Sequence, residues 1–416
     1  MIKKLLIIIC AIGTASLSLA YRLGGMSPSD FIDASPDKPM GLNSKLQVLH
    51  PDTLIKQAEH ALEQDNPELA KELTLKALSK NITNGLAFAQ LVAINTKKNS
   101  DYKDTEKLAQ LAEVLWPAHI GVQSKLAEFW LQQHNLPKLI HAWHLIMVRA
   151  PEVHQEIYPI LFKLLDFPET IEVLKSYTAN PPSWWQGLLN YTATQEQALQ
   201  QLRTLYELRE HTLTPLTAEE RSIFIYALVK NKLWEEAYFT WLAGLNEKQL
   251  QESGFIYNGS FEAIEKTPVF DWQYSNTPSI KITTAPTNGM IGQKALHLIL
   301  TDRDRVDFQH ISQITKLNAG VYTLTLNYRI DHMQTGEGLR WRIYCMNDKN
   351  TLLGESTALN KRSPWDVLKV DFEVPTSDCA FQIVRLEASS PFVNNHLFKG
   401  SLWFDGIQIT RTQPKP

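Results

Sequence analysis

Polar side chains of the kind that bind sugars alternate with apolar residues in two stretches near the C-terminal end of the chain, 322–330 and 339–345. Alternate side chains of a strand point to the same side, so we expect the polar set to share one outward sheet face. Planar groups stack on sugar rings, polar groups orient hydroxyls, and three arginines would pair bidentately with an anionic, uronate-like sugar. The side chains assigned to this surface are Asn327, Arg329, Arg340, Arg342, Tyr344, Trp272 and Trp365.

The two stretches belong to a C-terminal segment with the texture of an all-β domain. From about Glu252 onward, helical stripes give way to short alternating runs that Gly, Asn, Asp and Pro separate. The run 368–374, for example, alternates apolar and charged residues, which is typical of a strand with one buried face. Several such runs between turn residues predict an antiparallel β-sandwich over residues 251–416.

Four short segments of this domain resemble the jelly-roll carbohydrate-binding modules related to galactose-binding domains. They are NGSFE at 258–262, PVFDW at 268–272, LNAGVY at 317–322 and LWFDGI at 402–407. The resemblance implies a jelly-roll sandwich with a structural calcium near its first and last strands, held by Glu262 and Asp405, although no cofactor is required. The chain has Gly406 where a second acidic residue often follows in those modules.

The chain has three cysteines, and Cys10 lies in an apolar leader. If the leader is removed, Cys345 and Cys379 remain, and an oxidising compartment would let them pair as a disulfide. The alternative is that both are small buried apolar residues on separate strands. There is no CxxC motif or Cys/His cluster, so a zinc site or a thioredoxin-like centre has no support.

Residues 1–22 predict an export signal or a membrane anchor. Lys3 and Lys4 precede 16 apolar or small residues that end at Ala20. This run is short for a membrane span, which needs about 20 residues, but suits a signal peptide cleaved after Ala20. An uncleaved anchor is the alternative, and in both cases the rest of the chain is exported to face the periplasm. Residues 23–50 are rich in Pro, Ser, Asp and Gly and predict a flexible tether.

Residues 51–250 carry the 3.6-residue apolar stripes of paired helices. Pro117 and Pro151 occupy equivalent places 34 residues apart, and small residues such as Ala127 and Ala142 stand where paired helices would cross. Both features resemble tetratricopeptide repeats. The resemblance implies an all-α solenoid whose concave side binds an extended protein partner. His141 and His144 are the one histidine pair at ligand spacing here, and with no obvious third ligand we expect them to lie on a helix surface.

The charge balance and the absence of catalytic motifs exclude some classes of function. The 41 basic residues nearly balance the 44 acidic ones, which argues against a nucleic-acid partner. No GxSxG, HExxH, Walker or dinucleotide motif occurs, so we expect no enzyme. We expect a cell-envelope scaffold that binds a protein through its repeats and an acidic or neutral polysaccharide through its sandwich, accessory to surface-polysaccharide assembly or export, touching the membrane only through its N-terminal segment. The alternatives are a protein-only adaptor with a structural sandwich, and a polysaccharide-acting enzyme.

Overall fold

The computed structural model describes residues 50–98, 100–263, 267–301, 307–335, 337–392 and 398–412. The leader expected over residues 1–22 lies outside the described residues, as does the tether expected over 23–50 except for its last residue. The chain divides into two compact units, one ending at Leu216 and the other running from Thr217 to Pro416. No helix in the described ranges is long and apolar enough to span a membrane.

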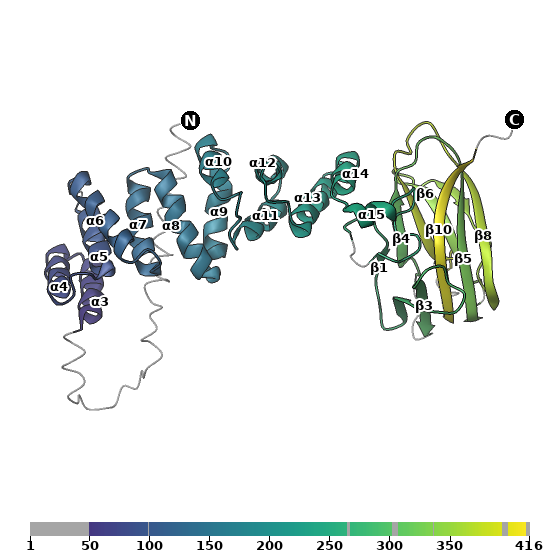
Figure 1. The fold of residues 1–416 in the computed structure, drawn as a ribbon, viewed down its shortest axis with the longest axis horizontal. Helices are drawn as coiled ribbons and strands as arrows, with labels where there is room; N and C mark the ends of the chain where they lie inside the picture. Colours follow the sequence, from purple (N-terminus) through teal and green to yellow (C-terminus); the bar gives the residue numbers. More distant parts are fainter. Residues whose placement is uncertain are drawn as a thin grey trace, which may run out of the picture. The chain divides into compact units, whose positions relative to one another are not determined.

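The first unit is built of successive antiparallel helical hairpins (Figure 1). Its first four hairpins begin at residues 51, 85, 120 and 154, steps of 34, 35 and 34 residues, and this regular spacing confirms the expected helical repeat. The helices are α3 (Pro51–Glu63), α4 (Pro67–Lys80), α5 (Gly85–Lys97), α6 (Tyr102–Leu115), α7 (Ile120–Gln132), α8 (Leu136–Arg149), α9 (His154–Leu164), α10 (Pro168–Lys175), α11 (Trp185–Thr194) and α12 (Leu199–Glu210).

Local sequence explains where these helices begin and how they pack. Asn66 and Asn135 cap α4 and α8 by accepting the backbone N–H three residues later at 3.2 Å, which satisfies one of the otherwise unpaired N-terminal amides. In the α7–α8 hairpin, the bulky Trp130 and Trp143 are buried beside the small Ala142. This hairpin therefore buries large and small residues together, and each repeat buries an apolar face that it could not bury alone.

The second unit begins with three more helices, α13 (Ala218–Lys230), α14 (Trp234–Ala243) and α15 (Glu247–Gln251), and α14 packs on the chain that forms the β-sandwich. Trp241 donates its indole N–H to Thr267 Oγ1 at 2.9 Å and meets the Tyr257 ring edge-on at 5.3 Å. Tyr238 meets Phe270 in the same way at 5.2 Å. Although the secondary structure changes near residue 251, the last helical hairpin thus belongs to the same compact unit as the sandwich.

The sandwich consists of two antiparallel five-stranded sheets, as expected for this domain. Sheet A has the strand order β1-β4-β9-β6-β7 and sheet B the order β2-β3-β10-β5-β8. Most successive strands change sheet, a topology typical of jelly rolls. The strands are β1 (Gln273–Tyr274), β2 (Ile280–Ala285), β3 (Ala295–Thr301), β4 (Ile311–Thr315), β5 (Gly320–Gln334), β6 (Leu339–Cys345), β7 (Leu352–Glu355), β8 (Ser363–Val374), β9 (Gln382–Ala388) and β10 (Lys399–Thr412).

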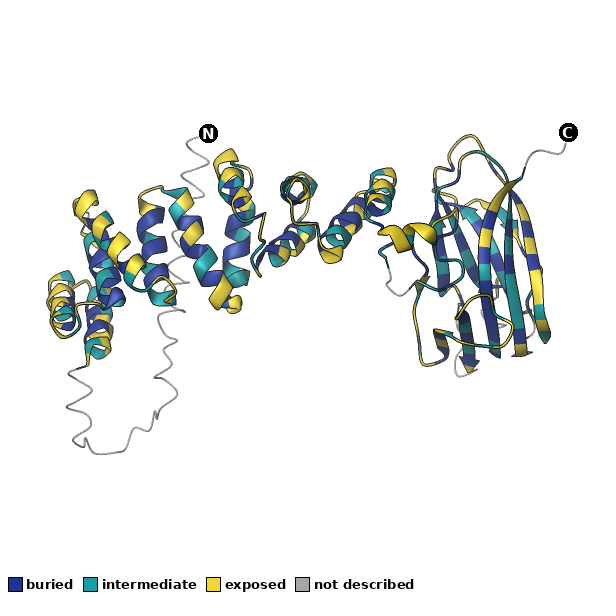
Figure 2. Ribbon diagram, in the orientation of Figure 1, coloured by how far each residue is buried: buried dark blue, intermediate teal, exposed yellow. Residues whose placement is uncertain are grey.

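The core lies between the two sheets and shows the expected alternation. Buried and less buried residues alternate strictly along β6 and β9 (Figure 2). The rings of Trp272, Trp341 and Phe404 meet in the middle of this core, with centroids 5.9 Å and 5.4 Å apart. Inward residues of both sheets therefore fix the sandwich, and the intervening residues face outward.

Candidate functional site

The five polar side chains predicted to share one face lie on two different sheets. Asn327 and Arg329 are on β5 of sheet B, whereas Arg340, Arg342 and Tyr344 are on β6 of sheet A. The prediction of a single surface is therefore wrong, because the chain crosses from one sheet to the other between β5 and β6. Within β6, however, these side chains alternate strictly with buried residues as expected, and in β5 Asn327 and Arg329 flank the partly buried Tyr328.

The outward side of sheet A carries a connected set of charged and phenolic side chains, which we call the arginine face. Register pairs Arg342 of β6 with Arg385 of β9 and pairs Arg340 with Glu387. The adjacent strand β7 ends at Glu355, opposite Arg342. The arginine face is defined by Arg340, Arg342, Tyr344, Glu355, Arg385 and Glu387.

Two of its three arginines share one carboxylate within the protein. Arg340 Nη1 and Arg342 Nε each lie 2.9 Å from one oxygen of Glu355. These hydrogen bonds and charges lower the pKa of the Glu355 carboxyl, with the bond from Arg342 the largest cause. Arg342 also donates to the carbonyl oxygens of Ala388 and Ser389 at 3.2 and 3.3 Å. Both guanidinium groups are thereby held in place, and neither is left over to pair with an anionic sugar.

Tyr344 and Arg385 form the centre of the arginine face. The Tyr344 hydroxyl donates to Glu387 Oε1 at 2.6 Å, and burial together with this carboxylate raises the pKa of Tyr344 to about 12. The Arg385 guanidinium lies 6.0 Å from the centroid of the Tyr344 ring and donates to Gln309 Oε1 at 3.2 Å. No carboxylate of the described residues forms an ion pair with Arg385.

A cleft of about 440 Å³ continues this surface at the β1–β4 edge of sheet A. Gln309 belongs to both, because it lines the cleft and accepts the hydrogen bond from Arg385. Burial lowers the pKa of His310, which keeps its imidazole neutral. The cleft therefore offers hydroxyl, amide and imidazole groups beside an aromatic ring. Its lining residues are Gln273, Tyr274, Ser275, Asp307, Gln309, His310 and Ser312.

On the outward side of sheet B, the predicted residues are tied into a closed cluster. The Arg329 guanidinium lies between the rings of Trp365 and Trp403, at 5.4 and 5.1 Å from their centroids. Arg329 pairs with Asp331 at 2.9 Å, and Trp403 donates to the same carboxylate at 2.9 Å. His297 stacks on Trp403 at 3.7 Å. The Trp403 ring thus has both His297 and Arg329 packed against it, and Arg329 also packs against the Trp365 ring.

Trp272 is not available as a sugar platform, so this assignment is wrong. Its side chain is 1% exposed, and its indole N–H donates to the carbonyl oxygen of Asn258 at 3.1 Å. Phe261 and Trp341 pack against its ring. The tryptophan belongs to the core between the sheets.

The two carboxylates implied as calcium ligands hold the loop between β2 and β3 instead. Asp405 is fully buried, and its Oδ2 accepts the backbone N–H of Ile291 at 2.6 Å. Glu262 Oε1 accepts the backbone N–H groups of Gln293 and Lys294 at 2.6 and 2.8 Å. Burial raises the pKa of Asp405, and the backbone N–H groups of Ile291 and Gly406 act in the opposite direction.

The residues around these carboxylates supply few side-chain ligands for a calcium ion. Ca²⁺ takes about six to eight oxygen ligands, which can include backbone carbonyls and waters, and no group of three or more His, Cys, Asp or Glu in the described ranges could hold a metal ion. Three of the four carboxylate oxygens of Glu262 and Asp405 already accept backbone amides. We therefore assign both residues to fixing the β2–β3 loop.

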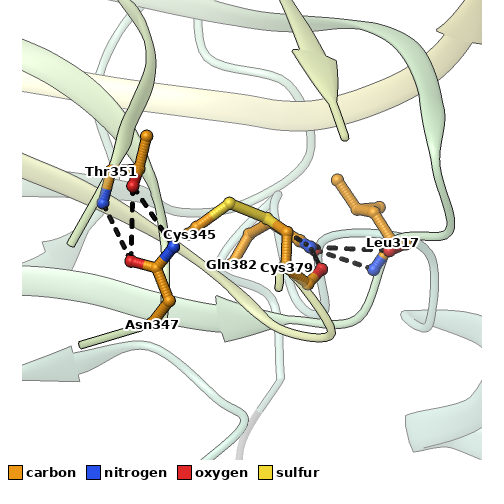
Figure 3. The surroundings of a disulfide bond; sticks show 6 residues. All are labelled: Leu317, Cys345, Asn347, Thr351, Cys379 and Gln382. Atoms are coloured by element: carbon orange, nitrogen blue, oxygen red, sulfur yellow. Dashed lines mark hydrogen bonds between the residues drawn. A yellow bond between two sulfur atoms is a disulfide. The ribbon is translucent and has the colours of Figure 1, made fainter. Parts of the chain in front are cut away.

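Cys345 and Cys379 form a disulfide, with Cα atoms 5.1 Å apart (Figure 3). Both are nearly inaccessible, at 1% and 7% exposure. Gln382, also buried, accepts the backbone N–H of Leu317 at 2.8 Å and donates to the Cys379 carbonyl at 2.6 Å. The disulfide and the side-chain amide of Gln382 connect three loops at one end of the sandwich.

In the helical unit, His141 and His144 take part in an aromatic cluster. Trp184 donates its indole N–H to His144 Nδ1 at 3.1 Å, and the Tyr177 ring lies 4.7 Å from the His144 ring. His141 lies 3.6 Å from Glu113. Burial lowers the pKa of His144, and the neighbouring His141 adds to this.

Reasoning from sequence missed Arg385, Glu387, Glu355 and Gln309. Arg385 and Glu387 could have been predicted to face outward, because buried and less buried residues alternate along 382–388 in the same way as along β6. Glu355 ends a four-residue strand, and Gln309 precedes β4 in a loop, so neither has a periodic signal.

Known proteins resemble the chain only weakly. No protein-family model matches the chain, and no curated protein matches it. Among solved structures, a CBM4 structure is similar over 38% of this chain and 99% of its own, with 14% identity and a TM-score of 0.28. TmCBM61 in complex with β-1,4-galactotriose has the same coverages and identity, with a TM-score of 0.25. Pseudomonas aeruginosa pilF is similar over 46% of this chain and 89% of its own, with 14% identity and a TM-score of 0.27. With TM-scores this low, the function has to be argued from the residues.

Proposed function

We propose that the β-sandwich binds a polysaccharide along the arginine face and the adjoining cleft of sheet A. The observation that carries this proposal is the continuity of the surface: Gln309 connects the cleft to Arg385, and Arg385 adjoins Tyr344. An extended sugar chain needs a row of fixed hydrogen-bonding groups with aromatic surface between them. Tyr274 in the cleft and Tyr344 on the face supply the aromatic surface.

The ligand is a neutral polysaccharide rather than the acidic one that three arginines suggested. Three arginines on the face stand against two glutamates, and Glu355 pairs with both Arg340 and Arg342. An anionic sugar would find only Arg385 unpaired, because to pair with Arg340 or Arg342 it would have to displace Glu355, which exchanges one carboxylate for another with little gain. Arg385 remains to donate to hydroxyl or ring oxygens.

The arrangement favours binding without catalysis. A glycosidase needs a carboxyl group whose raised pKa keeps it protonated as a general acid. On the arginine face, by contrast, the paired arginines lower the pKa of Glu355. Glu387 is engaged by the Tyr344 hydroxyl at 2.6 Å. Both carboxylates thus orient neighbouring donors.

In this proposal the helical repeats hold a protein partner, and the chain acts as an exported scaffold of the cell envelope. Stacked hairpins leave one broad side free for an extended protein segment. The apolar run that ends at Ala20 supports export to the periplasm, with or without retention as an anchor. As an accessory to surface-polysaccharide assembly or export, the chain would use both its protein-binding repeats and its polysaccharide-binding sandwich.

Affinity gel electrophoresis of the full chain tests the proposal. Gels containing xylan, galactan, glucan or polygalacturonate are run with the parent, Arg385→Ala and Tyr344→Ala, and with Lys369→Ala on the exposed side of β8 as the matched control. We expect at least one neutral polymer to retard the parent and the control. The loss of a charge-assisted hydrogen bond, about 1.5–3 kcal/mol, should weaken binding of Arg385→Ala about tenfold or more. Retardation by polygalacturonate alone, or equal retardation of all variants, contradicts the proposal.

A further inference from the structure

A second concave site lies at the disulfide end of the sandwich, between three strand-connecting loops. Residues 316–319 precede β5, residues 346–351 connect β6 to β7, and residues 375–380 connect β8 to β9. Together they enclose about 940 Å³, near the upper end of the range of about 300–1,000 Å³ that small-molecule sites occupy. We call this site the loop cup. None of the residues that define the arginine face lines it.

The loop cup is held in shape by cross-links that need no ligand. The disulfide connects the second loop to the third, and the buried Gln382 side chain connects the third to the first (Figure 3). Within the second loop, Asn347 Oδ1 accepts the backbone N–H of Thr351 at 3.2 Å. A site whose loops are already ordered loses little conformational entropy on binding.

The polar side chains of the loop cup are mostly unused by the protein. Asn318, Asp348, Lys349 and Asp378 form no hydrogen bond or ion pair through their side chains with any described residue, although opposite charges line the same cup. No aromatic side chain lines it. The charged and amide side chains of the lining are Lys316, which pairs with Glu235, Asn347, which bonds to Thr351, and the uncommitted Asn318, Asp348, Lys349 and Asp378.

We propose that the loop cup binds the end of a neutral, hydroxyl-rich saccharide. Two lysines balance two aspartates in the lining, which disfavours a polyanion or a polycation. A sugar hydroxyl both donates and accepts, so it can bridge an ammonium and a carboxylate that do not pair directly. Because no aromatic ring lines the cup, we expect recognition through hydrogen bonds to sugar hydroxyls. A terminal sugar has more free hydroxyls than one within the chain. The sugar class rests on the proposed function, but the site is separate.

The loop cup also adjoins the last helical hairpin. Lys316 pairs with Glu235 of α14 at 2.9 Å, and its ammonium lies 5.3 Å from the centroid of the Phe381 ring. Because an ammonium has three N–H donors, Lys316 can donate to a saccharide while it stays paired with Glu235. The loop cup thus lies next to a contact between α14 and the sandwich.

The test compares two double variants of the full chain on an array of neutral oligosaccharides attached through their reducing ends. Asp348→Ala/Lys349→Ala removes one charge of each sign from exposed positions, so the fold should be retained. We expect it to lose about tenfold or more in binding to short oligosaccharides. Tyr344→Ala/Arg385→Ala should keep that binding and lose retardation by long polymers, and Lys361→Ala is the matched surface control.

The outcomes separate this proposal from the previous one. If the cup variant and the parent give the same array profile, the loop-cup site is wrong and the arginine face is unaffected. The same holds if neither protein binds the array. If the polymer still retards both double variants, the proposed site on the arginine face is wrong and the loop-cup site is unaffected. A second arm uses a reducing agent, which should weaken binding in the loop cup and spare polymer retardation, because the disulfide connects two of the cup's loops.

Discussion

Removal of the disulfide should destabilise the sandwich unit and leave the helical unit unchanged. In the double variant Cys345→Ala/Cys379→Ala, the closed loop of 34 residues becomes free in the unfolded chain. The chain-entropy relation for a loop of this length predicts a loss of about 4 kcal/mol at 25 °C. Both cysteines are almost inaccessible. Alanine removes only the sulfur atom from each, so the cavity left at each site is small.

The expected shift in melting temperature follows from the size of the unit. An unfolding entropy of about 2.1 cal/mol/K per residue, over the roughly 200 residues from Thr217 to Pro416, gives a fall of about 9 °C. Differential scanning calorimetry of the full chain, read beside far-ultraviolet circular dichroism, distinguishes the two transitions. The unit that ends at Leu216 contains neither cysteine and is the internal control.

Two results would refute this reasoning. A fall of less than about 2 °C in the sandwich transition would mean that the loops are held by other contacts and that chain entropy has little effect. An equal fall in the helical transition would mean that the two units unfold as one cooperative body. In the oxidised parent, addition of a reducing agent should reproduce the effect of the double variant, though slowly because the sulfur atoms are buried.

Three further outcomes can be checked by urea unfolding. Gly289→Ala should lower stability by about 1–3 kcal/mol, because Gly289 has φ +81° and a Cβ there would lie 2.7 Å from the Trp365 ring; an unchanged midpoint would contradict the close approach. Gln382→Leu should cost about 1–3 kcal/mol through the backbone groups left unpaired, and a neutral effect would assign loop closure to the disulfide alone. Burial holds the pKa of His144 below its value of 6.5 in the unfolded chain, so the unfolded state binds the proton first and the helical unit should lose stability as pH falls below about 6.5. His144→Gln, which keeps an acceptor for Trp184, should flatten that dependence, and an equally steep pH profile in the variant would exclude His144 as its source.

Sequence patterns predicted the elements well because the patterns are local. The 34-residue spacing between Pro117 and Pro151 recurs in the starts of the helical hairpins. The alternation through Arg340 and Arg342 correctly separated inward from outward residues within β6. Such periodicities follow from the geometry of single helices and strands, which neighbouring residues determine.

Assembly of the site could not be predicted in the same way. Whether β5 and β6 share a sheet depends on pairing between distant strands, and β6 pairs with β9 and β7 instead. The burial of Trp272 depends on Trp341, which is far away in sequence. The charge of the arginine face was misjudged because Glu355, the partner of two arginines, ends a strand too short to show a pattern.

A crystal structure of the full chain with a bound oligosaccharide of the retarding polymer would show which surface of the sandwich holds the sugar. We expect sugar density along sheet A, with one ring over Tyr344 and a hydroxyl or ring oxygen within hydrogen-bond distance of Arg385. Density over the Trp365–Arg329–Trp403 cluster of sheet B, or an arginine face left bare while sugar binds elsewhere, would contradict this expectation.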